Sequence, residues 1–170
     1  MLEIRELTEH DIPQLLDYWF NSSPHDLNKM GADPDKIPSR ETLSSMLKNS
    51  LNSPIEERSS YCLIWYLEDE PIGHCNTNPT TFGEEAYMHL HLWNPSQRRK
   101  GIGSKAVNLC AEEFFNKLKL KRLYSQPKSD NRAPNKVLEK TGFQLVKNYV
   151  TVPGSINYEQ EVKLWVLEPQ

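Results

Sequence analysis

The feature that most restricts the fold is a strand pattern that leads through a basic, glycine-containing segment directly into a long helix pattern. Residues 85–93 have the composition of a strand. Residues 102–118 place apolar side chains mostly three or four positions apart, which predicts an amphipathic helix with a buried stripe. Gly101, Gly103 and a run of basic side chains lie at the junction. A strand and a long helix joined so closely favour a sheet covered by helices.

The remaining hydrophobic pattern predicts the order of the other elements. Strands and helices follow one another without an internal repeat or a linker. We therefore expect a single domain over residues 1–170, with an α/β (α+β) fold and one long meander. Further strands are predicted at 2–7, 60–67, 72–77, 122–126, 143–150 and 161–167, and further helices at 11–19, 39–51 and 133–141.

Residues 21–60 form a polar stretch that is broken by four prolines. Only the helix at 39–51, with Ser39 as its N-cap, is expected within it. A long insert of this kind is either a substrate lid or plain connecting structure, and the sequence favours neither reading.

The net charge of −3 conceals a strong separation of charge along the chain. Residues 1–97 hold 6 basic and 16 acidic side chains, whereas residues 98–140 hold 12 basic and 4 acidic ones. A basic block of this kind attracts polyanionic ligands. Nucleic acid is a poor candidate, because the block has only Phe114, Phe115 and Tyr124 for base stacking.

Several classes of protein are disfavoured by composition and spacing. No apolar run approaches the roughly 20 residues of a membrane helix, and the N-terminal residues predict a strand instead of a signal peptide. The three cysteines lack C-x-x-C spacing, and the five histidines lack metal-ligand spacing. We expect a soluble cytoplasmic protein, monomer or homodimer, that binds no metal, membrane or nucleic acid.

The segment at 101–106 is a candidate phosphate-binding site. The first N–H groups of a helix are unpaired and lie at its positive dipole end, and glycine lets an anion approach the backbone. The segment does not fit the P-loop pattern. It matches G-x-G-x-x-A, but it follows a meander, and Leu123 stands where a Rossmann unit would have an acidic residue.

Two motifs carry a resemblance to a known family. Residues 98–103, Arg-Arg-Lys-Gly-Ile-Gly, resemble the R-x-x-G-x-G acyl-CoA pyrophosphate loop of the GNAT superfamily of N-acyltransferases. Residues 131–143 resemble that family's N-x-x-A-x-x-x-x-E-K-x-G-F signature. The resemblance spans residues 2–167 and is closest to the branch that includes acetyltransferases of ribosomal-protein N-termini and of small amines.

The resemblance implies the GNAT fold and acetyl-CoA as cosubstrate. The expected sheet has about seven mostly antiparallel strands, splays between the strands at 85–93 and 122–126, and is flanked by about four helices. Backbone amides of 99–104 would hold the pyrophosphate, and main-chain groups of the strand at 85–93 would bind the pantetheine arm. The implied cofactor residues are Leu92, Trp93, Arg98, Arg99, Lys100, Gly101, Ile102, Gly103, Ser104, Asn131, Asn135 and Lys136.

An amine must be neutral to attack a thioester, although an amine of pKa near 10.4 is mostly protonated at pH 7. By the period-two rule, Tyr87, His89, His91 and Trp93 share one face of their strand. Imidazole is suited to accept the proton, so His91 and His89 are the candidate bases. A main-chain N–H near Leu92 or Trp93 is expected to stabilise the oxyanion.

The group that would protonate the departing thiolate is less evident. Leu138 stands where many family members have Tyr, and Pro134 where the N-terminal acetylase branch often has Ser. Tyr149, Tyr124 or water are the substitutes, unless the thiolate, with pKa near 8.5, leaves without an acid. Direct attack in a ternary complex is favoured over an acetyl-cysteine intermediate.

The predicted function is acetyl transfer from acetyl-CoA to a primary amine of a small molecule or of a peptide N-terminus. The acidic residues of 1–97 favour a cationic acceptor, although a solvated acidic surface gives the same count. The alternative is a non-catalytic acyl-CoA-binding module, which the missing Tyr and Ser leave open.

Overall fold

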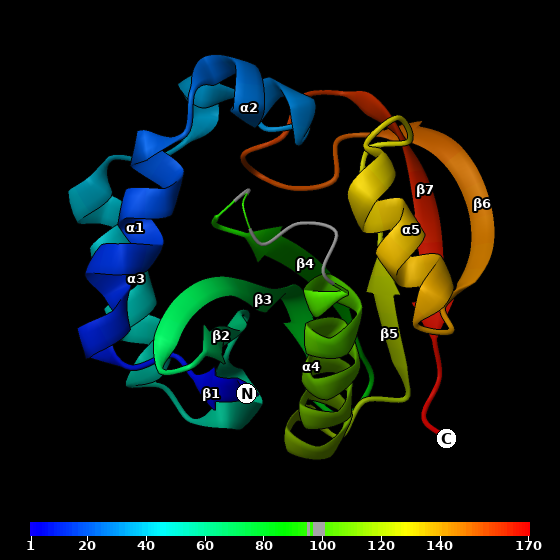
Figure 1. Ribbon diagram of the computed structural model, residues 1–170, viewed down its shortest axis with the longest axis horizontal. Helices are drawn as coiled ribbons and strands as arrows, with labels where there is room; N and C mark the ends of the chain where they lie inside the picture. Colours follow the sequence, from blue (N-terminus) through cyan, green and yellow to red (C-terminus); the bar gives the residue numbers. More distant parts are fainter. Residues whose placement is uncertain (95, 97–100) are drawn as a thin grey trace.

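The computed structural model describes residues 1–94, 96 and 101–170. Figure 1 shows a central sheet with α4 and α5 on one side and α1 and α3 beside its N-terminal strands. The strands are β1 (Leu2–Glu6), β2 (Tyr61–Leu67), β3 (Glu70–Thr81), β4 (Glu85–Leu92), β5 (Arg122–Ser125), β6 (Gln144–Thr151) and β7 (Gln160–Leu167). The α-helices are α1 (Ile12–Asn21), α2 (Pro24–Lys29), α3 (Arg40–Leu51), α4 (Ile102–Leu118) and α5 (Arg132–Lys140).

The described strands form one seven-stranded sheet in the order β1-β2-β3-β4-β5-β7-β6. The β4–β5 pair is parallel and the other pairs are antiparallel, which confirms the predicted mixed, mostly antiparallel sheet. Parallel neighbours need a long crossover, and α4 supplies it between β4 and β5. The helix predicted at 102–118 therefore has the predicted bounds and connects the two halves of the sheet.

Two buried hydrophobic clusters show which helices pack on the sheet. Ala86 and Met88 of β4 belong to the larger cluster, together with the buried stripe of α4 and Leu138 of α5. Residues of α1 and β2, with Leu7 directly after β1, form the smaller cluster, against which Trp93 packs from directly after β4. The alternation along β4 thus separates apolar side chains facing α4 from those facing the side of α1.

The insert at 21–60 is more ordered than the sequence predicted. The helix with Ser39 as N-cap forms as α3, but α2 also forms, with Ser23 accepting a hydrogen bond from the Asp26 amide and Pro24 at its first position. Proline is compatible with the first turn of a helix, so reading Pro24 only as a break was wrong.

The stretch after α2 is attached to the connection between β6 and β7, as the upper part of Figure 1 shows. Gly31 O accepts hydrogen bonds from the side-chain amides of Asn157 and Gln160, both at 2.9 Å. The Asp33 amide donates to Ile156 O at 2.7 Å, and Tyr158 OH donates to the carbonyl of residue 28 at 2.7 Å. We call this contact between residues 28–36 and 156–160 the latch.

Strand β3 begins at Glu70 and ends at Thr81, so it is longer than the predicted 72–77. The register with β4 shifts between Thr77 and Thr80, so a β-bulge absorbs the extra residues. Within the described ranges, no helix has the length and apolar character needed to cross a membrane.

Candidate active site

Strands β4 and β5 pair over only three positions. Glu85 lies opposite Arg122, and the pairing ends where Tyr87 lies opposite Tyr124. One step further, the Ser125 hydroxyl donates to Met88 O at 2.7 Å, in place of a backbone contact. Strand β4 nevertheless continues to Leu92, paired with β3 alone among the described strands. Its second half is therefore open on the β5 side, as the predicted splay requires.

The direction of the β4 peptide groups decides which of them face this opening. The Trp93 N–H donates to Ile72 O at 2.8 Å and so points toward β3. Successive peptide groups of a strand point to opposite sides, so the N–H and C=O groups of Leu92 and Leu90 point toward β5. The Trp93 amide, which was expected to bind the cofactor or the oxyanion, points away from the opening. The peptide groups of Leu92 and Leu90 are the better candidates for these contacts.

The N-terminus of α4 offers backbone donors next to this opening. Gly101 is the N-cap with φ +72°, in the left-handed region that glycine adopts readily. The first helical hydrogen bond runs from the Lys105 amide to Gly101 O at 3.3 Å, so the N–H groups of Ile102, Gly103 and Ser104 precede it. The Ile102 side chain is buried, which restricts this residue to a main-chain role. Three more predicted cofactor residues, Arg98, Arg99 and Lys100, lie outside the described residues.

Helix α5 approaches α4 at Gly103, where a Cβ atom would lie 3.3 Å from Val137 Cγ2. Asn131 is the N-cap of α5, and Lys136 is exposed on the helix. Asn135 is used within the protein, because its Oδ1 accepts from Trp165 Nε1 at 2.9 Å and its Nδ2 donates to Asn131 O at 2.8 Å. Its side chain therefore has a structural role at the start of α5, and its contact with the cofactor stays a prediction.

His91 faces the side of α1 and enters a cluster of aromatic rings. Its Nδ1 lies 2.9 Å from the Tyr18 hydroxyl, and its ring lies edge-on to Trp19 with centroids 5.0 Å apart. The opposite residue on β3, His74, stacks on it with centroids 4.8 Å apart and planes 18° apart. Trp93 Nε1 donates to His74 Nδ1 at 2.8 Å. Residues of α1, β3 and β4 thus form one connected group.

The imidazoles of this group are kept neutral by their surroundings. Burial, together with the smaller effect of the neighbouring His89, lowers the pKa of His91 to about 3. Burial, then His91 and His89, holds the pKa of His74 well below its usual value. Among the residues that the structure describes, the causes of both shifts are burial and neighbouring histidines. A neutral imidazole keeps a lone pair available on one ring nitrogen at physiological pH.

His89, the second candidate base, has a defined tautomer. Its Nε2 lies 2.8 Å from Asn78 O, and a carbonyl only accepts, so Nε2 carries the proton and Nδ1 the lone pair. Burial lowers its pKa. Among the described residues, no three His, Cys, Asp or Glu side chains gather in a way that could hold a metal ion.

The candidate acid, Tyr149, belongs to a different group of side chains. Its hydroxyl donates to Gln126 Oε1, and Lys147 lies over its ring with Nζ 4.6 Å from the centroid. Tyr149 also raises the pKa of Tyr87, after the larger effect of burial, and Tyr87 stacks on Tyr124 at 5.1 Å. The hydroxyl proton of Tyr149 is therefore engaged by an amide.

Sequence reasoning missed Tyr18, Trp19 and His74. The first two lie within the predicted helix at 11–19, and His74 lies within the predicted strand at 72–77. The one signal in the sequence was a polar His74 within a strand that also contains the apolar Ile72 and Cys75. That signal does not give the strand register, which places His74 opposite His91.

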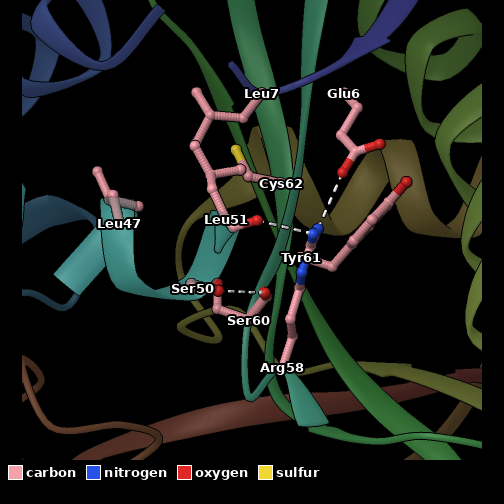
Figure 2. A pocket seen from close by; sticks show the side chains of 9 residues that line it. All are labelled: Glu6, Leu7, Leu47, Ser50, Leu51, Arg58, Ser60, Tyr61 and Cys62. Carbon is pink, nitrogen blue, oxygen red and sulfur yellow. Dashed lines mark hydrogen bonds and ion pairs between the residues drawn. The ribbon is translucent and has the colours of Figure 1, made fainter. Parts of the chain in front are cut away.

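Two hollows lie apart from this arrangement. Figure 2 shows a recess of about 10 Å³ where Arg58 donates to Leu51 O at 3.1 Å and forms an ion pair with Glu6 at 2.9 Å. It has room for about one water molecule. A hollow of about 550 Å³ between α1 and α3 is lined by side chains of both charges. Neither is lined by a predicted site residue.

Comparison with known proteins identifies similar chains. A family model for the acetyltransferase (GNAT) domain matches residues 1–144. Two proteins called aminoglycoside N(6')-acetyltransferase type 1, from Klebsiella pneumoniae and Serratia marcescens, are each 28% identical over 167 residues. Each alignment covers 91% of this chain and 80% of the relative.

Solved structures share the fold at lower identity. A ribosomal L7/L12 alpha-N-protein acetyltransferase in complex with coenzyme A has a TM-score of 0.77 and 18% identity, covering 98% of this chain and 93% of its own. Spermidine N-acetyltransferase from Vibrio cholerae, in complex with CoA and spermine, has a TM-score of 0.78 and 17% identity, covering 98% and 95%.

Proposed function

Because the chain belongs to the acetyltransferase (GNAT) domain family, we infer that it transfers an acetyl group from acetyl-CoA to a primary amine. The observation that carries this inference is the opening of β4 away from β5 beside the glycine N-cap of α4. A slender thioester arm needs such a gap, because it must pass from the side of α4 to the side of α1. Direct attack in a ternary complex then requires only that the amine bind on the side of α1.

On the cofactor side, acetyl-CoA would be held mainly by main-chain groups. The N–H groups of Ile102, Gly103 and Ser104 suit a pyrophosphate at the positive end of α4. Leu90 and Leu92 present peptide groups to the pantetheine arm, and an N–H of this pair suits the oxyanion of the tetrahedral intermediate. Asn131 and Lys136 remain proposed cofactor contacts, as do Arg98, Arg99 and Lys100.

On the acceptor side, we propose His91 as the group that accepts the proton of the attacking amine, with His89 as the second candidate. An imidazole of pKa about 3 does not deprotonate an ammonium ion of pKa near 10.4. The amine therefore attacks in its neutral form, and His91 takes the proton once the attacking nitrogen has become positive in the tetrahedral intermediate.

The departing thiolate needs no strong acid in this scheme. A thiol of pKa near 8.5 leaves readily, and water reaches a partly open site. Tyr149 stays a possible donor only if its hydroxyl leaves Gln126. Cys62, Cys75 and Cys110 are buried free thiols, and burial raises the pKa of Cys62 and Cys75, which supports direct attack over an acetyl-cysteine.

We propose an acceptor that is cationic in solution, such as an aminoglycoside, a polyamine or a peptide N-terminus. These are the substrates named for the similar proteins. The acidic residues of 1–97 would attract such an amine, and the uncharged cluster around His91 would favour its neutral form at the point of attack.

The test is thiol release from acetyl-CoA with an aminoglycoside, spermidine, a short peptide and glutamate as an anionic amine. Turnover with cationic acceptors, and little with glutamate, is the expected result. A preference for glutamate would overturn the charge argument. Tight acetyl-CoA binding without turnover of any amine would favour the alternative, a non-catalytic acyl-CoA-binding module.

A further inference from the structure

We propose that Lys136 and Lys140 of α5 bind the 3′-phosphate of acetyl-CoA and make the chain selective for a thioester that carries this phosphate. The inference rests on the proposed placement of the pyrophosphate at the N-terminus of α4, because the 3′-phosphate lies one ribose away from the pyrophosphate in the cosubstrate. The two lysines determine specificity in this scheme, since they contact a part of acetyl-CoA that is remote from the reacting thioester.

A row of cations runs along one side of α5. Arg132, Lys136 and Lys140 are four positions apart, so they lie one above another on the helix surface, and all three side chains are exposed. Like charges at this spacing repel each other and destabilise a helix. Arg132 also begins the helix, where the positive end of the dipole disfavours a cation, and the first turn holds no acidic residue. The row is therefore unfavourable in the free protein, and a bound anion would relieve the repulsion.

Three other basic side chains of residues 101–140 are neutralised by carboxylates, whereas this row is not. The neutralised pairs are Lys121–Glu84, Arg122–Glu85 and Lys128–Asp130, with N–O distances of 3.3, 3.9 and 2.6 Å. Within the described part of the chain, no ion pair involves Arg132, Lys136 or Lys140, although Glu139 belongs to the same helix. The positive charge of the row is therefore available to a ligand.

The packing of α5 on α4 places the two lysines beside the proposed pyrophosphate site. A Cβ atom on Gly103 would lie 3.3 Å from Val137 Cγ2, so the first turn of α4 contacts the middle of α5. Lys136 and Lys140 lie one residue before and three residues after Val137, which is about 1.5 and 4.5 Å along the helix axis. At 3.6 residues per turn both lie on the same side of Val137, whereas Leu138 lies on the other side and is buried. The lysines are therefore on the solvent side of the contact between α4 and α5, level with the first turn of α4.

The chemistry of this pair of lysines suits a phosphate monoester. Such a group carries a charge of about −1.5 to −2 at pH 7 and has three acceptor oxygens. An ammonium group binds phosphate as a point charge with three donors, so two lysines can share one phosphate without a fixed geometry. The pyrophosphate, in contrast, is proposed to bind the backbone N–H groups of Ile102, Gly103 and Ser104. Substituting the lysines should therefore affect the 3′-phosphate and leave the pyrophosphate contacts intact.

Acetyl-dephospho-CoA is the probe, because it differs from acetyl-CoA only in lacking the 3′-phosphate. Calorimetry with the full chain at one salt concentration measures the Kd of both thioesters for the wild-type protein and for Lys136→Gln/Lys140→Gln. We expect the wild-type protein to bind acetyl-CoA about tenfold more tightly than the probe, as two exposed charge contacts would give. The double variant should bind both thioesters with the affinity that the wild-type protein has for the probe.

The matched control is Lys117→Gln/Lys119→Gln, which removes the same charge from two exposed lysines at the C-terminal end of α4. It should keep the tenfold preference for acetyl-CoA. Loss of the preference in this control would show that general charge, and not the pair on α5, selects the cosubstrate, and would overturn the proposal.

Two further results would overturn the proposal. The first is equal affinity of the wild-type protein for the two thioesters, because no group would then bind the 3′-phosphate. The second is an equal loss of affinity for both thioesters in Lys136→Gln/Lys140→Gln, since the lysines would then act on another part of the cosubstrate. The proposed acetyl transfer is tested separately: phosphate-dependent binding without turnover of any amine would contradict the transfer and still support the recognition of the 3′-phosphate.

Discussion

The imidazole rings of His74 and His91 stack across the β3–β4 pair, with centroids 4.8 Å apart. Trp93 donates to Nδ1 of the first, and the Tyr18 hydroxyl lies against Nδ1 of the second. Two positive charges at this separation repel each other, and burial disfavours even one. The pair is therefore a neutral surface at the place where we propose that the amine attacks.

The first prediction concerns the pH dependence of kcat/KM for the acceptor. Of the described residues, the titratable groups next to His91 are His89 on its own strand, His74 on β3 and Tyr18 on α1. Because His91 stays neutral above a pKa of about 3, only the amine should titrate. The rate constant should rise about tenfold per pH unit between pH 6 and 9, toward the amine pKa near 10.4. A break near pH 6.5 in steady-state kinetics would show that a histidine titrates normally.

The second prediction concerns stability at low pH. An unfolded histidine binds a proton below about pH 6.5, whereas folded His74 does not, because its pKa is lowered. The unfolded state then binds more protons, so stability is full above pH 6.5 and is lost as the pH falls, by about 1.4 kcal/mol per unit for this group. His74→Gln keeps an acceptor for Trp93. It should reduce the slope of the free energy of unfolding against pH, measured by denaturant titrations at pH 7, 6 and 5. Equal slopes for both proteins would contradict the assignment.

The third prediction concerns the N-cap of α4. Gly101 has φ +72° and open space around its absent Cβ, so Gly101→Val acts on the backbone alone. A β-branched residue there costs about 1–2 kcal/mol and should turn the N–H groups away from the anion. We expect acetyl-CoA affinity to fall at least tenfold in calorimetry. Gly83→Val is the control, because Gly83 also has positive φ (+79°) and open space but lies away from α4's N-terminus.

The fourth prediction concerns the latch. A Cβ atom on Gly31 would lie 2.2 Å from Gln160 Oε1, in addition to the strain of φ +85°. Gly31→Ala should therefore destabilise the protein by about 2 kcal/mol and raise the acceptor KM, whereas Gly83→Ala should cost about 1 kcal/mol from backbone strain alone. Chemical denaturation and steady-state kinetics measure the two effects. If Gly31→Ala and Gly83→Ala lost similar stability, the close approach to Gln160 would contribute nothing beyond backbone strain.

The elements that carry the proposed cofactor side were predictable, because they depend on local sequence. Apolar spacing gave the bounds of α4, and a glycine at its start gave a positive-φ N-cap with donors behind it. The strand composition of β4 gave the face shared by His89 and His91. The mistakes were also local: Pro24 begins a helix, and β3 continues through a bulge past its predicted end at residue 77.

The order of the elements, the faces of the strands and the family motifs follow from local sequence, since periodicity and glycine placement act over a few residues. Tertiary packing instead places His74 in a stack with His91, brings Tyr18 to His91 and Met30 to Tyr18, and bonds Asn135 to Trp165. These contacts join residues from different elements. They depend on strand register and helix docking, which are set by the packing of the whole chain and not by any local pattern.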